Sequence, residues 1–306
     1  MWVIGLFQLL VPIVLIAVLA FVRQPNRWRW ALNGTAFVMA TTFLWATARW
    51  DLTSSYLRIV IPILFAVAAV VGYRRIAPPA KPVSRSQTAI AVVTAALLIV
   101  FMGGLNWFTF RGYRAPAGVV DLASPLRGAR FIVLHGGASP FINGHFHVRP
   151  QTYALDMLGQ NAIGARATAF ADRADLSGYA IFGAEVFSPC DGTVAVTVDE
   201  YDDLTPPAVD AAHPAGNHVL IECQGVEVLL AHLKRGSVRV SAGDAVTVAS
   251  RLAQVGNTGN TSEPHLHIHA ERGGQPRMIL DGAGVPISID GRFLVRGSVF
   301  ESDPRP

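Results

Sequence analysis

The first 110 residues of the chain contain almost no acidic groups and no histidine. They hold nine Lys or Arg residues and one acid, Asp51, whereas the residues from Arg111 onward hold 16 basic and 20 acidic side chains. The formal charge of +4 therefore combines a basic first part with an acidic remainder. Since the basic excess belongs to an apolar stretch, the net charge does not indicate nucleic-acid binding, and we expect no nucleic-acid partner.

Long apolar runs account for the scarcity of charge in this part. Four stretches approach the ~20 apolar residues that a helix needs to cross a lipid bilayer: they are 1–22, 30–47, 56–73 and 87–108. No basic residue precedes the first run, so we interpret it as a retained helix rather than a signal peptide. We predict an N-terminal four-helix transmembrane region over 1–110. Its few ionisable side chains favour anchoring over transport.

The basic segments between these runs predict an orientation. The segments 23–29 and 74–85 carry three and four Lys or Arg residues, whereas the link 51–55 carries only one charged residue, an Asp. Because basic loops tend to stay in the cytoplasm, the N-terminus and everything after residue 108 are expected outside. The sequence therefore predicts a multi-pass protein of the plasma or inner membrane with an extracytoplasmic C-terminal domain.

The remainder of the chain lacks long stretches with the 3.6-residue period of an amphipathic helix. Short runs rich in β-branched residues alternate instead with Gly, Pro, Asn and Asp, as strands and turns do. We predict a mainly antiparallel β domain over 130–275. A linker over 111–129 would join it to the membrane region, and a β-rich tail over 276–306 would follow it.

All nine histidines lie after residue 134, and His265, His267 and His269 alternate along one predicted strand. Alternate strand residues share a face, so one imidazole can hold a metal ion while its neighbour lies beside the reacting water. A catalytic zinc takes three protein ligands, with His and carboxylate among the favoured donors. Further donors occur at Asp156, which ends an apolar run, and at His232, which lies inside one.

Several longer segments accompany these histidines in a fixed order. They are FSPCDGTV (187–194), GNHVLIE (216–222), LLAHLKRGSV (229–238) and VGNTGNTSEPHLHIHA (255–270). Taken in order, these motifs resemble the lysostaphin-like (LytM-type) zinc endopeptidases. The resemblance covers about 130–272 and leaves the membrane region outside. It implies a LytM-like peptidase fold, a Zn²⁺ cofactor and hydrolysis of peptide cross-links in cell-wall peptidoglycan.

The resemblance also assigns roles to individual residues. In the family, a His and an Asp of the upstream motif bind zinc together with the second His of the H-x-H motif. Carried over, this gives Asp156 and His267 as ligands. His232 and His265 would form the catalytic pair that orients water and stabilises the developing oxyanion. His269 matches no family ligand, so we expect it to lie behind the ligands or at the surface and to be dispensable.

Two residues remain candidates for the upstream histidine ligand. The common family spacing, H-x3-D, is absent because residue 152 is Thr. A longer family pattern with a Gln followed by Y-A-x-D matches Gln151 and the residues after it, and its ligand lies six residues before the Gln. This pattern favours His145, with His147 as the alternative.

Only two cysteines are present, so a cysteine-rich scaffold is excluded, and a thiolate zinc site is not indicated beside the His/Asp set. Outside the membrane an even pair can form a disulfide. We predict that Cys190 and Cys223 are bonded, and two small buried thiols are the alternative.

The sequence thus indicates a membrane-anchored zinc endopeptidase that acts on peptidoglycan. A non-hydrolytic member of the same fold, which binds cell wall or regulates an amidase, is the alternative. The complete set of His and Asp residues favours the enzyme. A regulatory partner in the membrane or periplasm is compatible with the sequence, which does not identify one.

Overall fold

The computed structural model describes residues 2–79, 84–168 and 174–302, and the chain divides into two compact units, 1–110 and 111–306. Residues 80–83 of the predicted basic loop and 303–306 of the predicted tail lie outside the described residues. Each unit is described separately.

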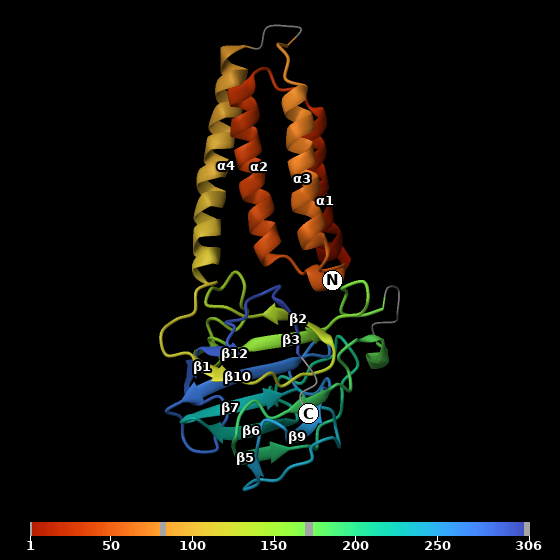
Figure 1. The fold of residues 1–306 in the computed structure, drawn as a ribbon, viewed down its shortest axis with the longest axis vertical. Helices are drawn as coiled ribbons and strands as arrows, with labels where there is room; N and C mark the ends of the chain where they lie inside the picture. Colours follow the sequence, from red (N-terminus) through yellow and green to blue (C-terminus); the bar gives the residue numbers. More distant parts are fainter. Residues whose placement is uncertain (1, 80–83, 169–173, 303–306) are drawn as a thin grey trace. The chain divides into compact units, whose positions relative to one another are not determined.

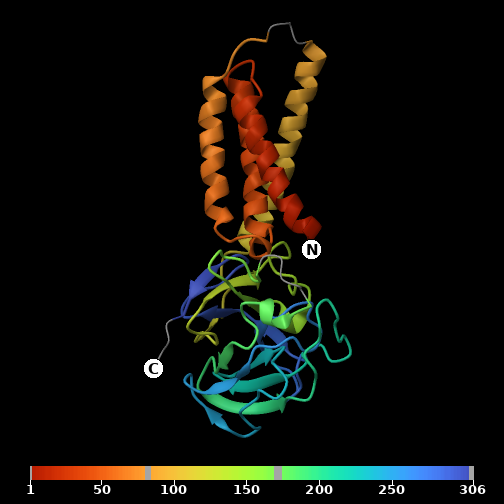
Figure 2. The same ribbon diagram turned by 90° about the vertical axis from the view of Figure 1, so that its right-hand side faces the viewer.

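The described part of the first unit contains four α-helices, which run side by side in Figures 1 and 2. Polar side chains on these helices find partners within the unit: Asn106 Nδ2 on α4 donates to the carbonyl of Met39 on α2 over 2.9 Å. The helices are α1 (Trp2–Phe21), α2 (Arg27–Thr47), α3 (Leu57–Arg74) and α4 (Arg85–Arg111), with a short 3-10 helix η1 (Trp50–Leu52) before α3.

Three of these helices, not the predicted four, are long and apolar enough to cross a membrane by length and composition. They are α1 (within Ile4–Phe21), α3 and α4. The prediction of a span at 30–47 is wrong on this criterion. A helix does form there, but Asn33 and several threonines lower its hydropathy below that of the other three.

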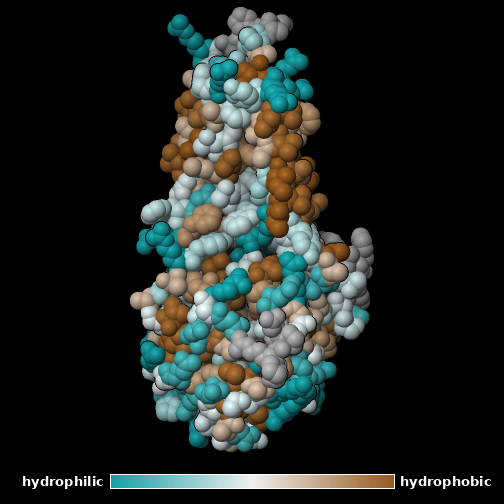
Figure 3. All heavy atoms as spheres, in the orientation of Figure 1, coloured by the Kyte–Doolittle hydropathy of each residue, from teal (hydrophilic) through white to brown (hydrophobic). Residues whose placement is uncertain are grey.

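Large apolar side chains cover the outside of the first unit, where Figure 3 shows a band of hydrophobic atoms along the helices. On α4, Leu97, Val100 and Phe101 are 65%, 75% and 61% exposed. An apolar surface of this extent is typical of a contact with lipid or with another protein.

The second unit is built on a nine-stranded sheet in which every pair of strands is antiparallel. Its order is β13-β2-β3-β10-β7-β6-β5-β8, with β11 beside β10 (Figure 1). The predicted antiparallel β domain is therefore confirmed. The strands are β1 (Val120–Leu122), β2 (Arg130–His135), β3 (Leu155–Gly159), β4 (Glu185–Phe187), β5 (Gly192–Val198), β6 (His218–Cys223), β7 (Val226–Ala231), β8 (Ala245–Val246), β9 (Arg251–Gln254), β10 (Leu266–Arg272), β11 (Ala283–Val285), β12 (Ile287–Ile289) and β13 (Val299–Glu301).

The alternation of β10 separates a core face from a polar face. Leu266, Ile268 and Ala270 belong to the main hydrophobic core, which is completed by buried residues of β3, β6 and β7. Because successive strand residues point to opposite faces, the histidines between them lie on the other face of the sheet. The core therefore fixes which way the H-x-H motif points.

The segments on either side of the predicted domain are part of the same fold. In the stretch that the sequence indicates as a linker, β1 pairs in parallel with β12, and Leu122 and Leu126 enter the main core. The tail contributes β11, β12 and β13, with Ile287 and Phe300 in the core. Both segments carry short apolar runs, and burying these runs closes the domain at its edges.

The two cysteines are joined by a disulfide, with Sγ atoms 2.01 Å apart. Cys190 lies just before β5 and Cys223 ends β6, and both are buried. The bond links two points 33 residues apart in the chain.

We predict that the double substitution Cys190→Ala/Cys223→Ala lowers the free energy of unfolding of the second unit by about 2–4 kcal/mol, because the unfolded chain gains loop entropy. Pulse proteolysis of the full chain in urea measures this loss. Reductant should lower the unfolding midpoint of the wild type and leave that of the variant unchanged. A wild-type midpoint insensitive to reductant would contradict the bond.

Candidate metal centre

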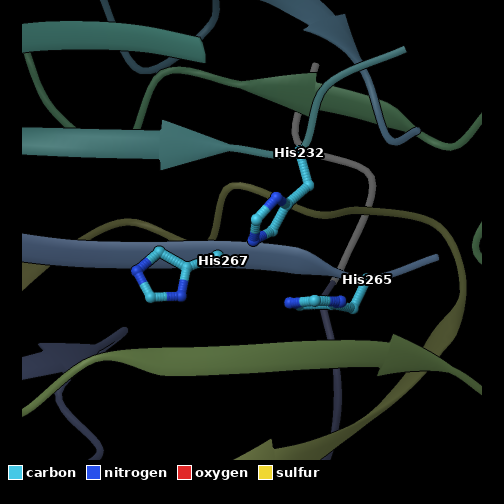
Figure 4. Close-up of side chains that lie close together, drawn as sticks. All are labelled: His232, His265 and His267. Atoms are coloured by element: carbon cyan, nitrogen blue, oxygen red, sulfur yellow. The ribbon is translucent and has the colours of Figure 1, made fainter. Parts of the chain in front are cut away.

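The carboxylate and the imidazoles of the candidate site meet at the centre of the sheet. β10 lies between β3 and β7, in a register that sets His267 opposite Asp156 on one side and Ala231 on the other. His232 directly follows β7, and His265 directly precedes β10. In Figure 4 the rings of His232, His265 and His267 point toward a common space. Asp156 and His267, more than 100 positions apart in the sequence, thus meet because their strands are neighbours in the sheet.

His145 reaches the same place from the loop between β2 and β3. Its Nε2 lies 2.8 Å from Asp156 Oδ2, and its Nδ1 lies 3.1 Å from Gln151 Oε1. The loop is fixed by Asn143, which is buried, accepts the amide of His145 and donates to the carbonyls of Gly137 and Ala154. Gln151 Oε1 can accept the Nδ1 proton, so Nε2 is the nitrogen that faces the carboxylate.

Three donor groups converge at this point. One ligand atom from each of His145, Asp156 and His267 lies within 4.8 Å of the others, and His267 Nδ1 is 2.8 Å from Asp156 Oδ1. Two imidazoles and one carboxylate form a donor set that suits a catalytic zinc, which keeps its fourth position open.

The carboxylate dominates the electrostatics of the three groups. Burial alone would raise the pKa of Asp156, but the neighbouring His145 and His265 hold it well below its usual value. Burial would lower the pKa of His145, but Asp156 raises it above the usual value, so His145 must release a proton before it binds a metal ion. Burial lowers the pKa of His267 to about 3 and outweighs the effect of Asp156. An ionised carboxylate beside a neutral imidazole is the protonation state that metal ligands need.

The remaining two histidines flank this set with one nitrogen each left free. His232 Nδ1 donates to the carbonyl of Thr258 over 2.8 Å, and His265 Nδ1 donates to that of Glu263 over 2.9 Å. His265 Nε2 lies 3.6 Å from Asp156 Oδ1, and the ring centroids of His232 and His265 are 4.7 Å apart. Each ring therefore directs its Nε2 toward the site, where that nitrogen can exchange a proton.

The state of His232 is set by its surroundings. Burial, reinforced by the neighbouring His265 and His267, holds its pKa well below the usual value. Its backbone has φ +64°, a left-handed conformation that non-glycine residues seldom adopt and that is often found at functional sites. Hydrogen bonds from the amide of His232 to Ala215 and from the amide of Gly256 to His232 hold this conformation in place.

The structure distinguishes the two candidates for the upstream histidine. His147 is exposed, and its ring packs against Phe146. It belongs to neither group of potential ligands among the described residues, which are His145, Asp156 and His267, and His232, His265 and His267. His145 is the one beside Asp156. The sequence pattern favours His145, and the turn of the loop places His145 rather than His147 beside the carboxylate.

Sequence patterns missed the groups that orient the histidines. The carbonyls of Thr258 and Glu263 have no signature, because any residue supplies a carbonyl. Glu271 could have been found, since it continues the alternation of His265, His267 and His269 on β10. His269 is 1% exposed and its Nδ1 lies 2.9 Å from His267 Nε2, so it lies behind the ligand rather than at the surface.

Comparison with family models matches part of the second unit. Residues 175–278 match peptidase family M23, and this stretch does not include His145 or Asp156. The match includes His232, His265 and His267. The resemblance to the LytM-type peptidases is thereby confirmed. Among curated proteins, none matches the chain.

Solved structures similar to this chain include two peptidases and one complex. A putative M23 peptidase from Pseudomonas aeruginosa is 19% identical, with 51% of this chain and 47% of that chain covered and a TM-score of 0.28. Lysostaphin from Staphylococcus simulans is 18% identical, with 35% and 42% covered and a TM-score of 0.21. The SpoIIQ–SpoIIIAH pore-forming complex is 16% identical, with 43% and 59% covered and a TM-score of 0.27. The chain thus spans less than two thirds of each.

We predict that His145→Ala removes zinc from the protein and that His147→Ala does not, because only His145 lies beside Asp156 and His267. The zinc content of the full-length chain, purified with one equivalent of zinc and measured by mass spectrometry, checks this. His147→Ala is the matched control, since it removes the same side chain two residues away. Zinc retained by His145→Ala and lost from His147→Ala would reverse the assignment.

Proposed function

We propose that the second unit is a zinc endopeptidase that hydrolyses peptide cross-links of peptidoglycan on the extracytoplasmic side of the membrane. The observation that carries the proposal is the convergence of His145 Nε2, the Asp156 carboxylate and His267 Nδ1 on one point. The M23 domain supports the reaction class and the polymer.

His145, Asp156 and His267 are the side chains that would hold the metal ion. Zinc at this position supplies a Lewis acid that polarises a peptide carbonyl and makes water more acidic. The three ligands come from two strands and a braced loop, so their geometry is set before substrate arrives. Such preorganisation reduces the free-energy cost of reaching the transition state.

His232 and His265 carry the proton transfers in this proposal. Each has its Nδ1 proton committed to a backbone carbonyl, so its Nε2 accepts a proton from the attacking water and returns it to the leaving amine. While protonated, either imidazole donates a hydrogen bond to the developing oxyanion. The low pKa of His232 keeps the ring neutral, and so able to act as a base, before the reaction.

A binding module without hydrolytic activity is the competing function. A binding role needs no convergent ligand set and no pair of imidazoles with free Nε2 atoms. The presence of both within one site argues for hydrolysis.

The extracytoplasmic location is proposed from charge. The α3–α4 link is flanked by Arg74, Arg75 and Arg85, and no acid lies between α3 and Arg111. Basic links are retained in the cytoplasm, so the chain after α4 would lie on the opposite side. An enzyme acting on peptidoglycan must lie on that side.

We predict that the full-length chain loaded with zinc releases new amino groups from purified peptidoglycan. His232→Ala should keep its zinc and lose about 10²–10⁴-fold in kcat, because it removes one proton carrier and leaves the ligands intact. Amine labelling of the digest measures the rate, with His147→Ala as the control. A wild type that binds zinc stoichiometrically and releases nothing would refute the hydrolytic function.

We predict that Ala212→Cys is labelled in intact cells by a membrane-impermeant maleimide, whereas Ser86→Cys is labelled only after permeabilisation. Both positions are exposed, Ala212 in the second unit and Ser86 at the start of α4. The native cysteines are bonded to each other and give no background. The opposite pattern of labelling would place the domain in the cytoplasm.

A further inference from the structure

A buried histidine lies directly behind the ligand set and is not used by the mechanism above. His269 is 1% exposed, and it lies opposite Leu229 of β7 beside an apolar cluster that includes Leu220. A polar ring in such surroundings is costly unless its nitrogens have partners. Its Nδ1 lies 2.9 Å from His267 Nε2, and its Nε2 lies 3.5 Å from Glu271 Oε1.

Glu271 fixes the direction of this chain of contacts. The side chain is fully buried, and its two carboxylate oxygens accept the backbone amides of Leu280 over 2.9 Å and Gly282 over 2.7 Å. A carboxylate held in this way is an acceptor. His269 Nε2 faces it at 3.5 Å without forming a hydrogen bond, and the negative charge there favours the proton on that nitrogen. The other nitrogen, Nδ1, is then an acceptor, and His267 must donate its Nε2 proton to it.

A proton on Nε2 of His267 leaves the other nitrogen, Nδ1, with a lone pair. With its proton on Nε2, His267 turns the lone pair of Nδ1 toward Asp156 Oδ1, 2.8 Å away. Two acceptors at this distance repel each other unless a cation lies between them. In the other tautomer, His267 would give its Nδ1 proton to Asp156, and the lone pair that a metal ion needs would be lost.

We propose that His269 and Glu271 are positioning residues, which hold His267 in the tautomer that binds metal through Nδ1. This rests on the proposed function, because it assigns a supporting role to residues behind the same ligand set. The expectation from the sequence that His269 is dispensable is thereby reversed. Hydrogen-bond partners of metal-ligating histidines commonly change metal affinity by about 10–100-fold.

The first test is the zinc affinity of the full-length chain, measured by competition with a chromophoric chelator. His269→Leu removes the acceptor and should weaken zinc binding by about 10–100-fold. His269→Asn retains an acceptor oxygen near the position of Nδ1, so its affinity should be closer to that of the wild type than to that of His269→Leu. His147→Leu is the matched control and should bind zinc as the wild type does.

The second test can be read in the wild type, with variants used for comparison and for assignment. In metal-free full-length protein labelled with [15N]histidine, the nitrogen chemical shifts of His267 report which nitrogen carries the proton. The proposal expects the proton on Nε2 in the wild type and on Nδ1 in His269→Leu. Loss of the signals in His267→Ala assigns them.

The outcomes separate this inference from the function on which it rests. Unchanged zinc affinity in His269→Leu, or a proton on His267 Nδ1 in the wild type, overturns the role of His269 even if peptidoglycan is cleaved. Conversely, a wild type that binds zinc without cleaving peptidoglycan refutes the proposed function and leaves both measurements on His269 interpretable.

Discussion

The pairing of β3 with β10 is the constraint on which the site depends. It sets Asp156 opposite His267 and buries the carboxylate to 3% exposure. A buried carboxylate is costly unless it is paired, and here three imidazoles surround it. A slip of one residue in this register would turn the histidines into the core and Leu266 and Ile268 out of it. The hydrophobic core and the polar site therefore specify the same register.

Local patterns in the sequence were enough to predict the strands, whereas the roles of the site residues came from the resemblance to the LytM-type peptidases. Alternation along 265–269 indicated that the histidines share a face, and the apolar run before Asp156 placed it on a strand. The choice between His145 and His147 required the tertiary structure of their loop. The two histidines lie two residues apart in one loop. The turn of this loop is fixed by Asn143, whose side chain donates hydrogen bonds to the carbonyls of Gly137 and Ala154. Contacts of that kind depend on tertiary structure and leave no periodic signal.

The errors in the prediction have separate physical causes. In α2, a 21-residue helix formed as expected, but threonines and Asn33 make it less apolar than its neighbours, and length alone did not reveal this. The stretch 111–129 was expected to be a linker although it contains β1, and the tail was expected to be β-rich without firm strand bounds, because β1, β12 and β13 are three residues long. Such strands are too short to show alternation, and only their partners define them.

The chain from His267 through His269 to Glu271 extends the site beyond the residues that meet substrate. Glu271 is held by the amides of Leu280 and Gly282, which belong to the loop between β10 and β11. In the proposed arrangement, the orientation of His267 would depend on backbone amides just beyond the far end of its own strand. β11 pairs with β10 at Glu271, so this C-terminal strand also holds the Glu271 carboxylate in place. In this arrangement, that carboxylate determines which nitrogen of His269 carries the proton and which accepts. The segment outside the matched M23 region would then help to fix the tautomer at the centre of the site.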